Sequence, residues 1–598
     1  MHGANNCTFE KVVGRLMSFF VSCAEISQSC RDESRGGDAA GRGDVRREIG
    51  MTGVVDWEKR AAKVREAARK AWAHFRESML VLGTSDVAPF VGDGCSDGES
   101  GCTDWLSAKA TLFDSLGTLW LMELKDEFND AVELISSGSV SVTTGVTYPA
   151  KVFEYHLRCV GGLLEGYFLS GNRMLLAAAK RAADAMIYSG AFDTPSGLPR
   201  PKARIVHPSS LPRFIAARVL DFFMNIVDKA QACNSLAGVG SFTLEFYALS
   251  RETGDQRYAN IADRIISHLK RIHQNDPDVL LPMFMRVDAS NLRGSGDDFC
   301  TSHASLRGLS SGSDSFYEYL VKEPLLRKSG DIELYEWLME GLVSQKFGLL
   351  LKQPGDSGIF LQSSANSTRV SHLGCYFSGT VALASKYFSR PQDLSLARGL
   401  LSGCLDAYAS APLTGLGPEK SRITSDGAVK SVEPAYRLRP EVAESVHVMY
   451  QVTREAAYRR KAWAIFESIE AHCQTPSGFS GLVSVESGEL DRAQPSFFIA
   501  ETLKYLYLTL KGPSDVLDLF VFSTEGHLLT KDVRCVSLGS DSLPLDPCHG
   551  SDDIQMGSWL HFAPTPKLDV IVIFIPIVLL AWALLRRLAM PKASGKVL

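Results

Sequence analysis

The chain has 598 residues, of which 45% are apolar and 22% are charged. Such a composition can bury a large core, which excludes an intrinsically disordered, collagen-like or small disulfide-stapled protein. The 63 basic and 68 acidic residues leave a net charge of −5, so the chain lacks the positive footprint that binding to nucleic acid requires.

The first 54 residues are expected to form a head and a linker outside the folded body. Lys11 and Arg15 precede a short apolar stretch, residues 16–24, as in a secretory signal peptide, although two serines interrupt it. A disordered head or a wrong start site fits these residues equally well. Residues 31–50 mix glycine with charges of both signs and predict a flexible linker.

Helical periodicity dominates from about residue 55. Apolar side chains between Val64 and Met79 recur at helical spacing behind Asp56, a candidate N-cap. Helical patterns also cover residues 105–135, 151–170, 173–190, 238–252, 257–272, 314–328, 331–346, 372–389, 393–409, 437–453, 456–472 and 495–510. Helices of similar length with short connections predict an all-α toroid or solenoid. No repeat of fixed period is present, which disfavours an open array of the tetratricopeptide kind.

The C-terminal region predicts a membrane anchor. Residues 570–585, VIVIFIPIVLLAWALL, carry no charge, and Arg586 and Arg587 follow directly. This order predicts a transmembrane helix with a cytosolic tail and a lumenal main body. Because the span is short, it suits an endoplasmic reticulum or Golgi membrane better than the plasma membrane.

The sequence divides into five segments. They are a signal-like head with a flexible linker (1–54), a folded body (55–530), a juxtamembrane stem (531–567), a transmembrane helix (568–587) and a cytosolic tail (588–598). The thirteen cysteines form no repeated C-x-x-C, so they give no zinc pattern. Phosphate-binding, zinc-protease and serine-hydrolase motifs are also missing from the sequence.

Carboxylates stand where several helical patterns begin. Glu154, Asp314 and Glu441 do so, and Glu501 interrupts an apolar segment. One acidic residue in a first helical turn is explained by the helix dipole, which contributes about 0.3–1 kcal/mol. Several carboxylates flanked by aromatic and basic residues predict a pocket, since a buried carboxylate must be paired, metal-bound or protonated. A protonated acid and a carboxylate in one pocket can hydrolyse a glycosidic bond. Oxygen-rich surroundings with a hydroxyl such as that of Thr524 suit Ca²⁺.

Dispersed motifs then occur in one register between about residues 57 and 530. They include TLFDSLGTLW at Thr111, FExxxR at Phe153, DSFYEYL at Asp314, GLGPE at Gly415, LRPExxES at Leu438, SFFIAETLKYLYL at Ser496 and FSTEGH at Phe522. Through these motifs the sequence resembles glycoside hydrolase family 47, the class I α-mannosidases of the secretory pathway. The resemblance implies an (α/α)₇ toroid barrel plugged by a β-hairpin. It also implies inverting, Ca²⁺-dependent removal of α-1,2-linked mannose from high-mannose N-glycans on glycoproteins.

Roles for individual residues come from the same resemblance. Glu154 would be the general acid, acting through a water, Glu441 the general base, and Asp314 the third catalytic carboxylate. The mannose subsite would be lined by Arg158, His372, Glu444, Phe497 and Glu501. Thr524 would bind Ca²⁺ through its hydroxyl and carbonyl oxygens.

Two subgroups of the family match different parts of the chain. The oligosaccharide-trimming enzymes match the segments around Cys375 and Cys404, which implies a disulfide between these residues. The degradation-enhancing relatives, which handle misfolded glycoproteins, match the FSTEGHLL segment instead. The balance of motifs favours a trimming enzyme.

Three glycines depart from the family pattern. Gly117 stands where the family usually has a second Asp, Gly238 where it usually has an acidic residue, and Gly312 where some members carry an Arg that helps to select the glycan branch. These departures keep open a non-hydrolytic factor that binds mannosylated, misfolded glycoproteins. A purely structural membrane scaffold is disfavoured by the pocket motifs.

Overall fold

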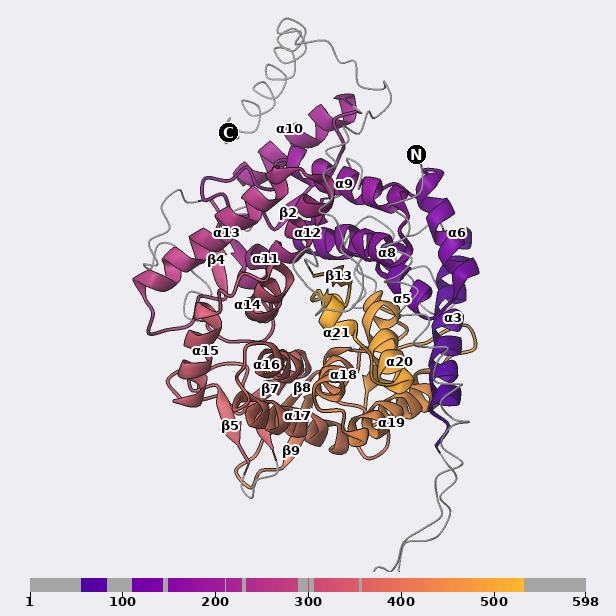
Figure 1. Ribbon diagram of the computed structural model, residues 1–598, viewed down its shortest axis with the longest axis vertical. Coiled ribbons are helices and arrows are strands. Elements are labelled where there is room, and N and C mark those ends of the chain that lie inside the picture. Colours follow the sequence, from indigo (N-terminus) through magenta and orange to yellow (C-terminus); the bar gives the residue numbers. More distant parts are fainter. Residues whose placement is uncertain are drawn as a thin grey trace, which may run out of the picture. The chain divides into compact units, whose positions relative to one another are not determined.

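The computed structural model describes residues 55–82, 110–143, 149–209, 211–227, 233–288, 300, 306–353 and 358–531 (Figure 1). The chain divides into two compact units, residues 1–535 and 536–598, and every described residue belongs to the first unit. The predicted head, transmembrane helix and cytosolic tail therefore lie outside the described residues. Within the described ranges, no helix has the length and apolar character needed to cross a membrane.

Helices make up most of the described unit. The helices of its first half are α3 (Trp57–Leu82), α4 (Ala110–Asp114), α5 (Leu116–Leu121), α6 (Lys125–Ser136), α7 (Val152–Glu154), η1 (Tyr155–Gly161), α8 (Gly162–Ser170), α9 (Arg173–Tyr188), α10 (Leu211–Val227), α11 (Leu236–Gly240), α12 (Thr243–Thr253) and α13 (Gln256–Asn275). Those of its second half are α14 (Asp314–Arg327), α15 (Glu333–Val343), η4 (His372–Cys375), α16 (Tyr376–Tyr387), α17 (Asp393–Ala409), α18 (Glu441–Thr453), α19 (Ala456–Cys473), η5 (Phe498–Leu503), α20 (Lys504–Lys511) and α21 (Val516–Leu519).

Short strands pair antiparallel between the helices. The paired strands are β1 (Ala150–Lys151) with β2 (Lys202–Ala203), β3 (Cys233–Ser235) with β4 (Phe284–Arg286), β5 (Leu350–Lys352) with β6 (Ile359–Leu361), β10 (Leu482–Ser484) with β11 (Glu489–Leu490), and the three-stranded β7 (Arg369–Ser371), β8 (Lys420–Ile423) and β9 (Val429–Glu433). The hairpin of β12 (Phe520–Phe522) and β13 (Leu528–Thr530) completes the set in the described residues. These strands connect and brace the helices, and they form no extended sheet.

Tight connections turn consecutive helices into antiparallel pairs. Gly171 ends α8 in the left-handed region at φ 72°, and the side chain of the next residue, Asn172, accepts a hydrogen bond from the Met174 N–H to start α9. Gly254 and Asp255 repeat this arrangement between α12 and α13. A glycine takes the left-handed conformation at little steric cost, and an Asn or Asp satisfies a free amide of the first helical turn.

The helices form two layers. Contacts join the inner helices in a closed ring from α5 through α8, α12, α14, α16, α18 and α20, and η5, which precedes α20, contacts α5. In the same order, these inner helices contact the outer helices α6, α9, α13, α15, α17, α19 and α3 (Figure 1). Every residue of α18 from Glu441 to Gln451 is buried, whereas α13 buries one stripe between Tyr258 and Ile272. An outer helix needs only one apolar face, while an inner helix is covered on both sides.

The β12–β13 hairpin lies inside this ring (Figure 1). Its strands contact the inner helices α8, α12 and α14, and the Phe522 and Leu528 side chains, which face each other at the turn, are buried. Residues 523–527 form the connecting turn, with Gly526 in the left-handed region at φ 68°. The hairpin thereby carries its turn to the interior of the unit.

Most predicted helices are present, but several differ in detail. The predicted 238–252 helix is divided into α11 and α12, the 372–389 helix begins with the 3₁₀ turn η4, and the 495–510 helix contains the π-helical turn η5. Asp56 caps α3 by accepting a hydrogen bond from the Lys59 N–H at 2.9 Å, as predicted. The described part of the predicted 105–135 helix is divided into α4, α5 and α6, with Glu123 at φ 59° before α6. The predicted 151–170 helix contains the π-helical turn η1. Helix α10 was not among the predicted helices.

Candidate active site

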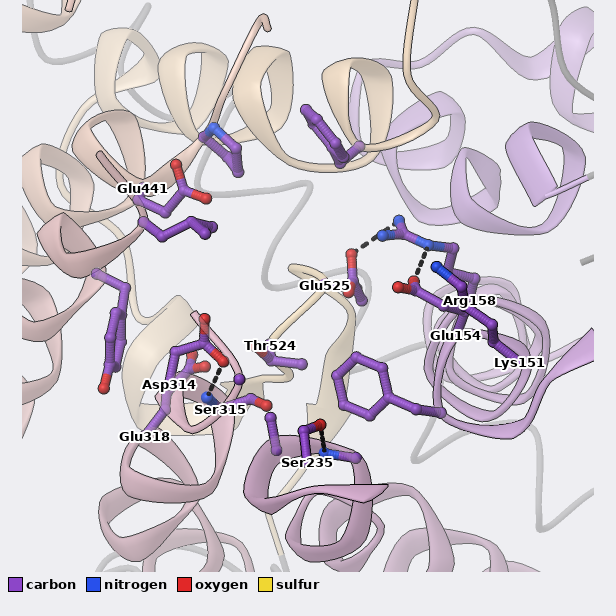
Figure 2. A pocket seen from close by; sticks show the side chains of 18 of the residues that line it. Lys151, Glu154, Arg158, Ser235, Asp314, Ser315, Glu318, Glu441, Thr524 and Glu525 are labelled. Carbon is purple, nitrogen blue, oxygen red and sulfur yellow. Dashed lines mark hydrogen bonds and ion pairs between the residues drawn. The ribbon is translucent and has the colours of Figure 1, made fainter. Parts of the chain in front are cut away.

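A cavity of about 410 Å³ gathers side chains from the starts of inner helices and from the hairpin turn (Figure 2). Its acidic lining residues are Glu154, Asp314, Glu318, Glu441, Glu444, Glu501 and Glu525. Its basic lining residues are Lys151, Arg158, Lys202 and Arg439. Among the described residues the lining therefore holds more carboxylates than cations. Such a cavity suits a neutral ligand rich in hydroxyl groups, or a cation.

Glu441 is held in its ionised form. It begins α18 directly after Pro440, and its Oε2 atom lies 2.7 Å from Nδ1 of His372. Burial opposes ionisation, but the hydrogen bond with His372 and the charge of Arg439 hold the pKa of Glu441 below its ordinary value. Arg439 is itself fixed by two hydrogen bonds to Glu419, at 2.7 and 2.9 Å. A buried carboxylate kept ionised in this way can act as a base.

Asp314 has the opposite electrostatic environment. It begins α14, and its Oδ1 atom accepts a hydrogen bond from the Ser315 N–H at 3.0 Å. Removal from bulk water raises its pKa to about 7, with further contributions from the charges of Glu318 and Glu441. Asp314 and Glu441 therefore line one cavity with pKa values displaced in opposite directions, which is the arrangement expected of an acid and a base.

Arg158 organises the opposite wall of the cavity (Figure 2). Its guanidinium donates to Glu154 at 3.0 Å and to Asp114 at 2.9 Å, and it forms an ion pair with Glu525 at 2.8 Å. Arg158 lies in η1, and π-helical turns inside α-helices occur frequently at functional sites. One buried cation thus joins carboxylates from α4, α7 and the hairpin turn.

The floor of the cavity carries an excess of acidic groups. Lys322 forms ion pairs with Glu318 and Glu444. Burial raises the pKa of Glu444 to about 8, although the charge of Lys322 opposes this rise. The charge of Glu318 adds to it. Burial and the charges of Glu525 and Glu444 raise the pKa of Glu501 well above its ordinary value. Without a further cation, the cavity cannot hold all of these carboxylates in their ionised form.

The structure brings most of the predicted site residues to this one cavity. Those that line it are Glu154, Arg158, Asp314, Glu441, Glu444, Phe497, Glu501 and Thr524. His372 differs, because its ring lies behind Glu441, and its second nitrogen contacts the Tyr408 hydroxyl at 2.8 Å. Cys375 and Cys404 form a disulfide that ties η4, which begins with His372, to α17.

Several residues that line the cavity or contact its lining were given no role from the sequence. Arg439 stands two residues before Glu441 in the same motif, and Asp114 lies within the TLFDSLGTLW segment. Asn234 and Ser235 line the cavity from β3, which a second disulfide, Cys233–Cys300, fastens. Arg439 and Asp114 could have been identified from the sequence, because both lie within quoted motifs. No local sequence pattern indicated that β3 would line the cavity.

A profile of glycosyl hydrolase family 47 matches residues 67–531 of the chain, a range that contains every acidic residue of the cavity. The chain belongs to glycosyl hydrolase family 47. Membership places it among the glycoside hydrolases, most of which use a pair of Asp or Glu carboxyl groups.

Relatives in family 47 are similar over most of their length. The mannosyl-oligosaccharide 1,2-alpha-mannosidase MNS1 of Arabidopsis thaliana is 33% identical over 483 residues, which cover 79% of each chain. The human mannosyl-oligosaccharide 1,2-alpha-mannosidase IC is 33% identical over 481 residues, or 78% of this chain and 70% of the human one. An alpha-1,2-mannosidase from Trichoderma reesei superposes with a TM-score of 0.64 over 79% of this chain and 99% of that chain. At 24% identity, this last likeness concerns the fold alone.

The three glycines that depart from the family pattern differ in the space beside them. Neighbouring side chains occupy this space at Gly117 and Gly238 but not at Gly312. A Cβ atom at Gly117 would lie 1.9 Å from Cδ of Glu165, and one at Gly238 would lie 2.4 Å from Oδ1 of Asn234. At Gly312 the backbone has φ +90°, and the nearest atom to an added Cβ would be 3.6 Å away. A side chain at Gly312 would have space but a strained backbone. The three departures therefore have different structural consequences.

The oxygen donors of the cavity fit the calcium ion that the family resemblance implies. Thr524 lies in the hairpin turn and lines the cavity with its surrounding carboxylates (Figure 2). Ca²⁺ prefers such oxygen ligands, and a divalent cation would offset the excess of buried negative charge. Across the described ranges, no three His, Cys, Asp or Glu side chains converge as a direct metal-binding group. Within these ranges the fit therefore rests on the oxygen atoms of Thr524.

Proposed function

We propose that the chain is an inverting α-1,2-mannosidase that removes terminal mannose from high-mannose N-glycans with the help of Ca²⁺. Family membership and the names of the similar plant and human proteins support this reaction. The observation that carries the proposal is the pair of Asp314 and Glu441, which line one cavity with oppositely displaced pKa values.

In the proposed reaction, Glu441 accepts a proton from a water molecule as that water attacks the anomeric carbon. Glu154 delivers a proton through a second water to the departing glycosidic oxygen, and Asp314 is a further group that holds a proton near neutral pH. Inversion requires room for the attacking water between acid and base, which are then about 6.5–9.5 Å apart. His372 positions Glu441 and favours its ionised form.

The remaining cavity residues bind the sugar. Phe497 lines the cavity and offers an apolar ring to mannose, and its ring centroid lies 6.0 Å from Cζ of Arg158 and 5.8 Å from Cζ of Arg439. Glu444 and Glu501 are placed to accept hydrogen bonds from sugar hydroxyls. When bound, Ca²⁺ would coordinate and polarise such hydroxyls, with Thr524 as its protein ligand through hydroxyl and carbonyl oxygens.

The finer architecture and the cellular setting are part of the proposal. Seven inner–outer helix pairs among the described residues support an (α/α)₇ barrel with the β12–β13 hairpin as its plug. Two disulfides, Cys233–Cys300 and Cys375–Cys404, support an oxidising compartment such as the secretory lumen. Anchorage by residues 568–587 in an endoplasmic reticulum or Golgi membrane stays a prediction.

A glycan digest tests the proposal. The full chain with Ca²⁺ is expected to release mannose from a high-mannose N-glycan, and a chelator should abolish this release. Glu441→Gln should bind the glycan but fall by about 10²–10⁴-fold in kcat. Glu467→Gln, at an exposed position on α19, is the matched control and should keep full activity.

The same digest separates the alternatives. Glycan binding without turnover, unaffected by Glu441→Gln, would instead support the non-hydrolytic quality-control factor. Failure to bind either mannose or Ca²⁺ would contradict both functions and leave a structural role.

A further inference from the structure

Glu165 and Lys504 form an ion pair in the interior of the unit. The Lys504 Nζ atom lies 2.7 and 2.9 Å from the two carboxylate oxygens of Glu165, and both side chains are fully buried. Neither residue lines the cavity. Replacing a buried ion pair with apolar side chains is often neutral or stabilising, so such a pair is weak evidence for a stabilising role. Its contacts indicate a different purpose.

The pair holds the turn that carries Thr524. Lys504 also donates to the Gly526 carbonyl oxygen at 2.7 Å, and the Leu528 N–H donates to Glu165 Oε1 at 3.2 Å. These two backbone groups follow Thr524 closely in the chain. The turn is thus fixed on its C-terminal side by charge-assisted hydrogen bonds from α8 and α20, which are stronger than neutral ones.

Gly117 is the position that makes room for this carboxylate. The Cδ and both carboxylate oxygens of Glu165 lie 1.9–2.3 Å from an ideal Cβ at residue 117. A C–C bond is about 1.5 Å long. A Gly117→Asp substitution would therefore place its carboxyl carbon close to that of Glu165, and any side chain at Gly117 would displace Glu165. An acidic side chain at either position 117 or position 165 would therefore place its carboxylate in the same buried space.

We propose that Glu165 is a positioning residue, which supplies from α8 the carboxylate that fixes Lys504 and the 523–528 turn, and so holds Thr524 where Ca²⁺ and substrate are bound. This inference rests on the proposed function. On this proposal Gly117 is compatible with a complete site, because the Glu165 carboxylate from α8 occupies the space that a side chain at residue 117 would fill.

The test measures Ca²⁺ binding to the metal-free full chain by calorimetry. Substitution of residues behind a metal ligand typically lowers metal affinity about 10–100-fold. We expect a loss of this size for Glu165→Gln, which keeps the volume but removes the charge, and a smaller loss for Glu165→Asp. Hydrogen exchange of the 523–528 amides in the metal-free protein should accelerate in both variants.

Rescue and control variants separate positioning from stability. Gly117→Asp combined with Glu165→Ser returns the carboxylate to α5, and should restore Ca²⁺ affinity and slow exchange, whereas Glu165→Ser alone should not. Asp393→Asn removes another buried carboxylate, paired with Arg390 and Tyr335 away from the hairpin. It should lower the melting temperature while leaving Ca²⁺ affinity unchanged.

The outcomes distinguish this inference from the proposed function. Wild-type affinity and wild-type exchange of the turn in Glu165→Gln would overturn the positioning role, while chelator-sensitive hydrolysis by the wild type would still support the mannosidase. If Gly117→Asp with Glu165→Ser did not recover Ca²⁺ affinity while Asp393→Asn behaved as expected, a carboxylate at residue 117 could not replace that of Glu165. This result would also contradict the inference. If the wild type bound no Ca²⁺, the proposed calcium dependence would fail, and exchange of the turn amides would still decide the positioning role.

Discussion

Nδ1 of His372 lies 2.7 Å from Oε2 of Glu441, and the other ring nitrogen contacts the Tyr408 hydroxyl at 2.8 Å. The imidazole is therefore held on both sides, and it stabilises the carboxylate from behind the cavity wall. This contact connects η4, α17 and the start of α18 to one proposed catalytic group.

Substitution of His372 is expected to shift the pH dependence of the reaction. His372→Phe removes the hydrogen bond that lowers the pKa of Glu441, so this pKa should rise. A hydrogen bond to a charged group is worth about 1.5–3 kcal/mol, which corresponds to about one to two pH units. Because the base must be ionised, the acidic limb of kcat/KM should move to higher pH. Tyr408→Phe, which keeps the His372–Glu441 contact, should shift it less; an unmoved acidic limb in His372→Phe would refute this role.

Asp314 is expected to define the alkaline limb. Burial raises its pKa to about 7, so a step that needs its proton should slow as the pH rises through about 7. Asp314→Asn should lower kcat about 10²–10⁴-fold and abolish this limb. Glu154→Gln is the comparison variant and should lower kcat while keeping the alkaline limb. Persistence of the limb in Asp314→Asn would assign the proton to another group.

The stability of the metal-free protein should fall as the pH rises. Burial raises the pKa of Glu444 and of Glu525 to about 8, so each binds its proton more tightly in the folded protein than in the unfolded chain. Stability from these groups is fully present below their unfolded pKa of about 4.3 and is lost as the pH rises through about 8.

Thermal melting with chelator at pH 6 and pH 8 measures this effect. We expect a lower melting temperature at pH 8, and saturating Ca²⁺ should remove most of the difference by stabilising the ionised carboxylates. Glu444→Gln should reduce the pH dependence in chelator. A metal-free melting temperature that rises between pH 6 and pH 8 would contradict the electrostatic argument.

The two disulfides in the described part of the chain should affect different kinetic constants. Removing either one should lower the free energy of unfolding by about 2–4 kcal/mol. Cys375→Ser with Cys404→Ser loosens η4, so kcat should fall through the His372–Glu441 contact. Cys233→Ser with Cys300→Ser loosens β3, which lines the cavity through Asn234 and Ser235, so KM should rise instead. Steady-state kinetics of the two pairs of variants at a temperature well below melting checks this division, and identical effects on both constants would argue against it.

Local patterns were sufficient for much of the fold and for part of the site. Apolar spacing predicted most helices, and Asp56 was identified as a cap, because helix periodicity and capping depend on residues a few positions apart. The carboxylates Glu154, Asp314 and Glu441 were selected from motifs around them, and all three line one cavity. The sequence by itself therefore determined a mainly helical body and part of its acidic pocket.

Only the tertiary structure decided how distant side chains act on one another. His372 lies behind Glu441, 69 positions along the chain, and no local pattern reports that contact. The sequence likewise presented Gly117 as the loss of a side chain, whereas the fold places the Glu165 carboxylate in the same space and binds it to Lys504, 339 positions away. Burial, charge pairing and space are properties of the packed molecule, and they determine the pKa of a carboxylate and the effect of a missing side chain.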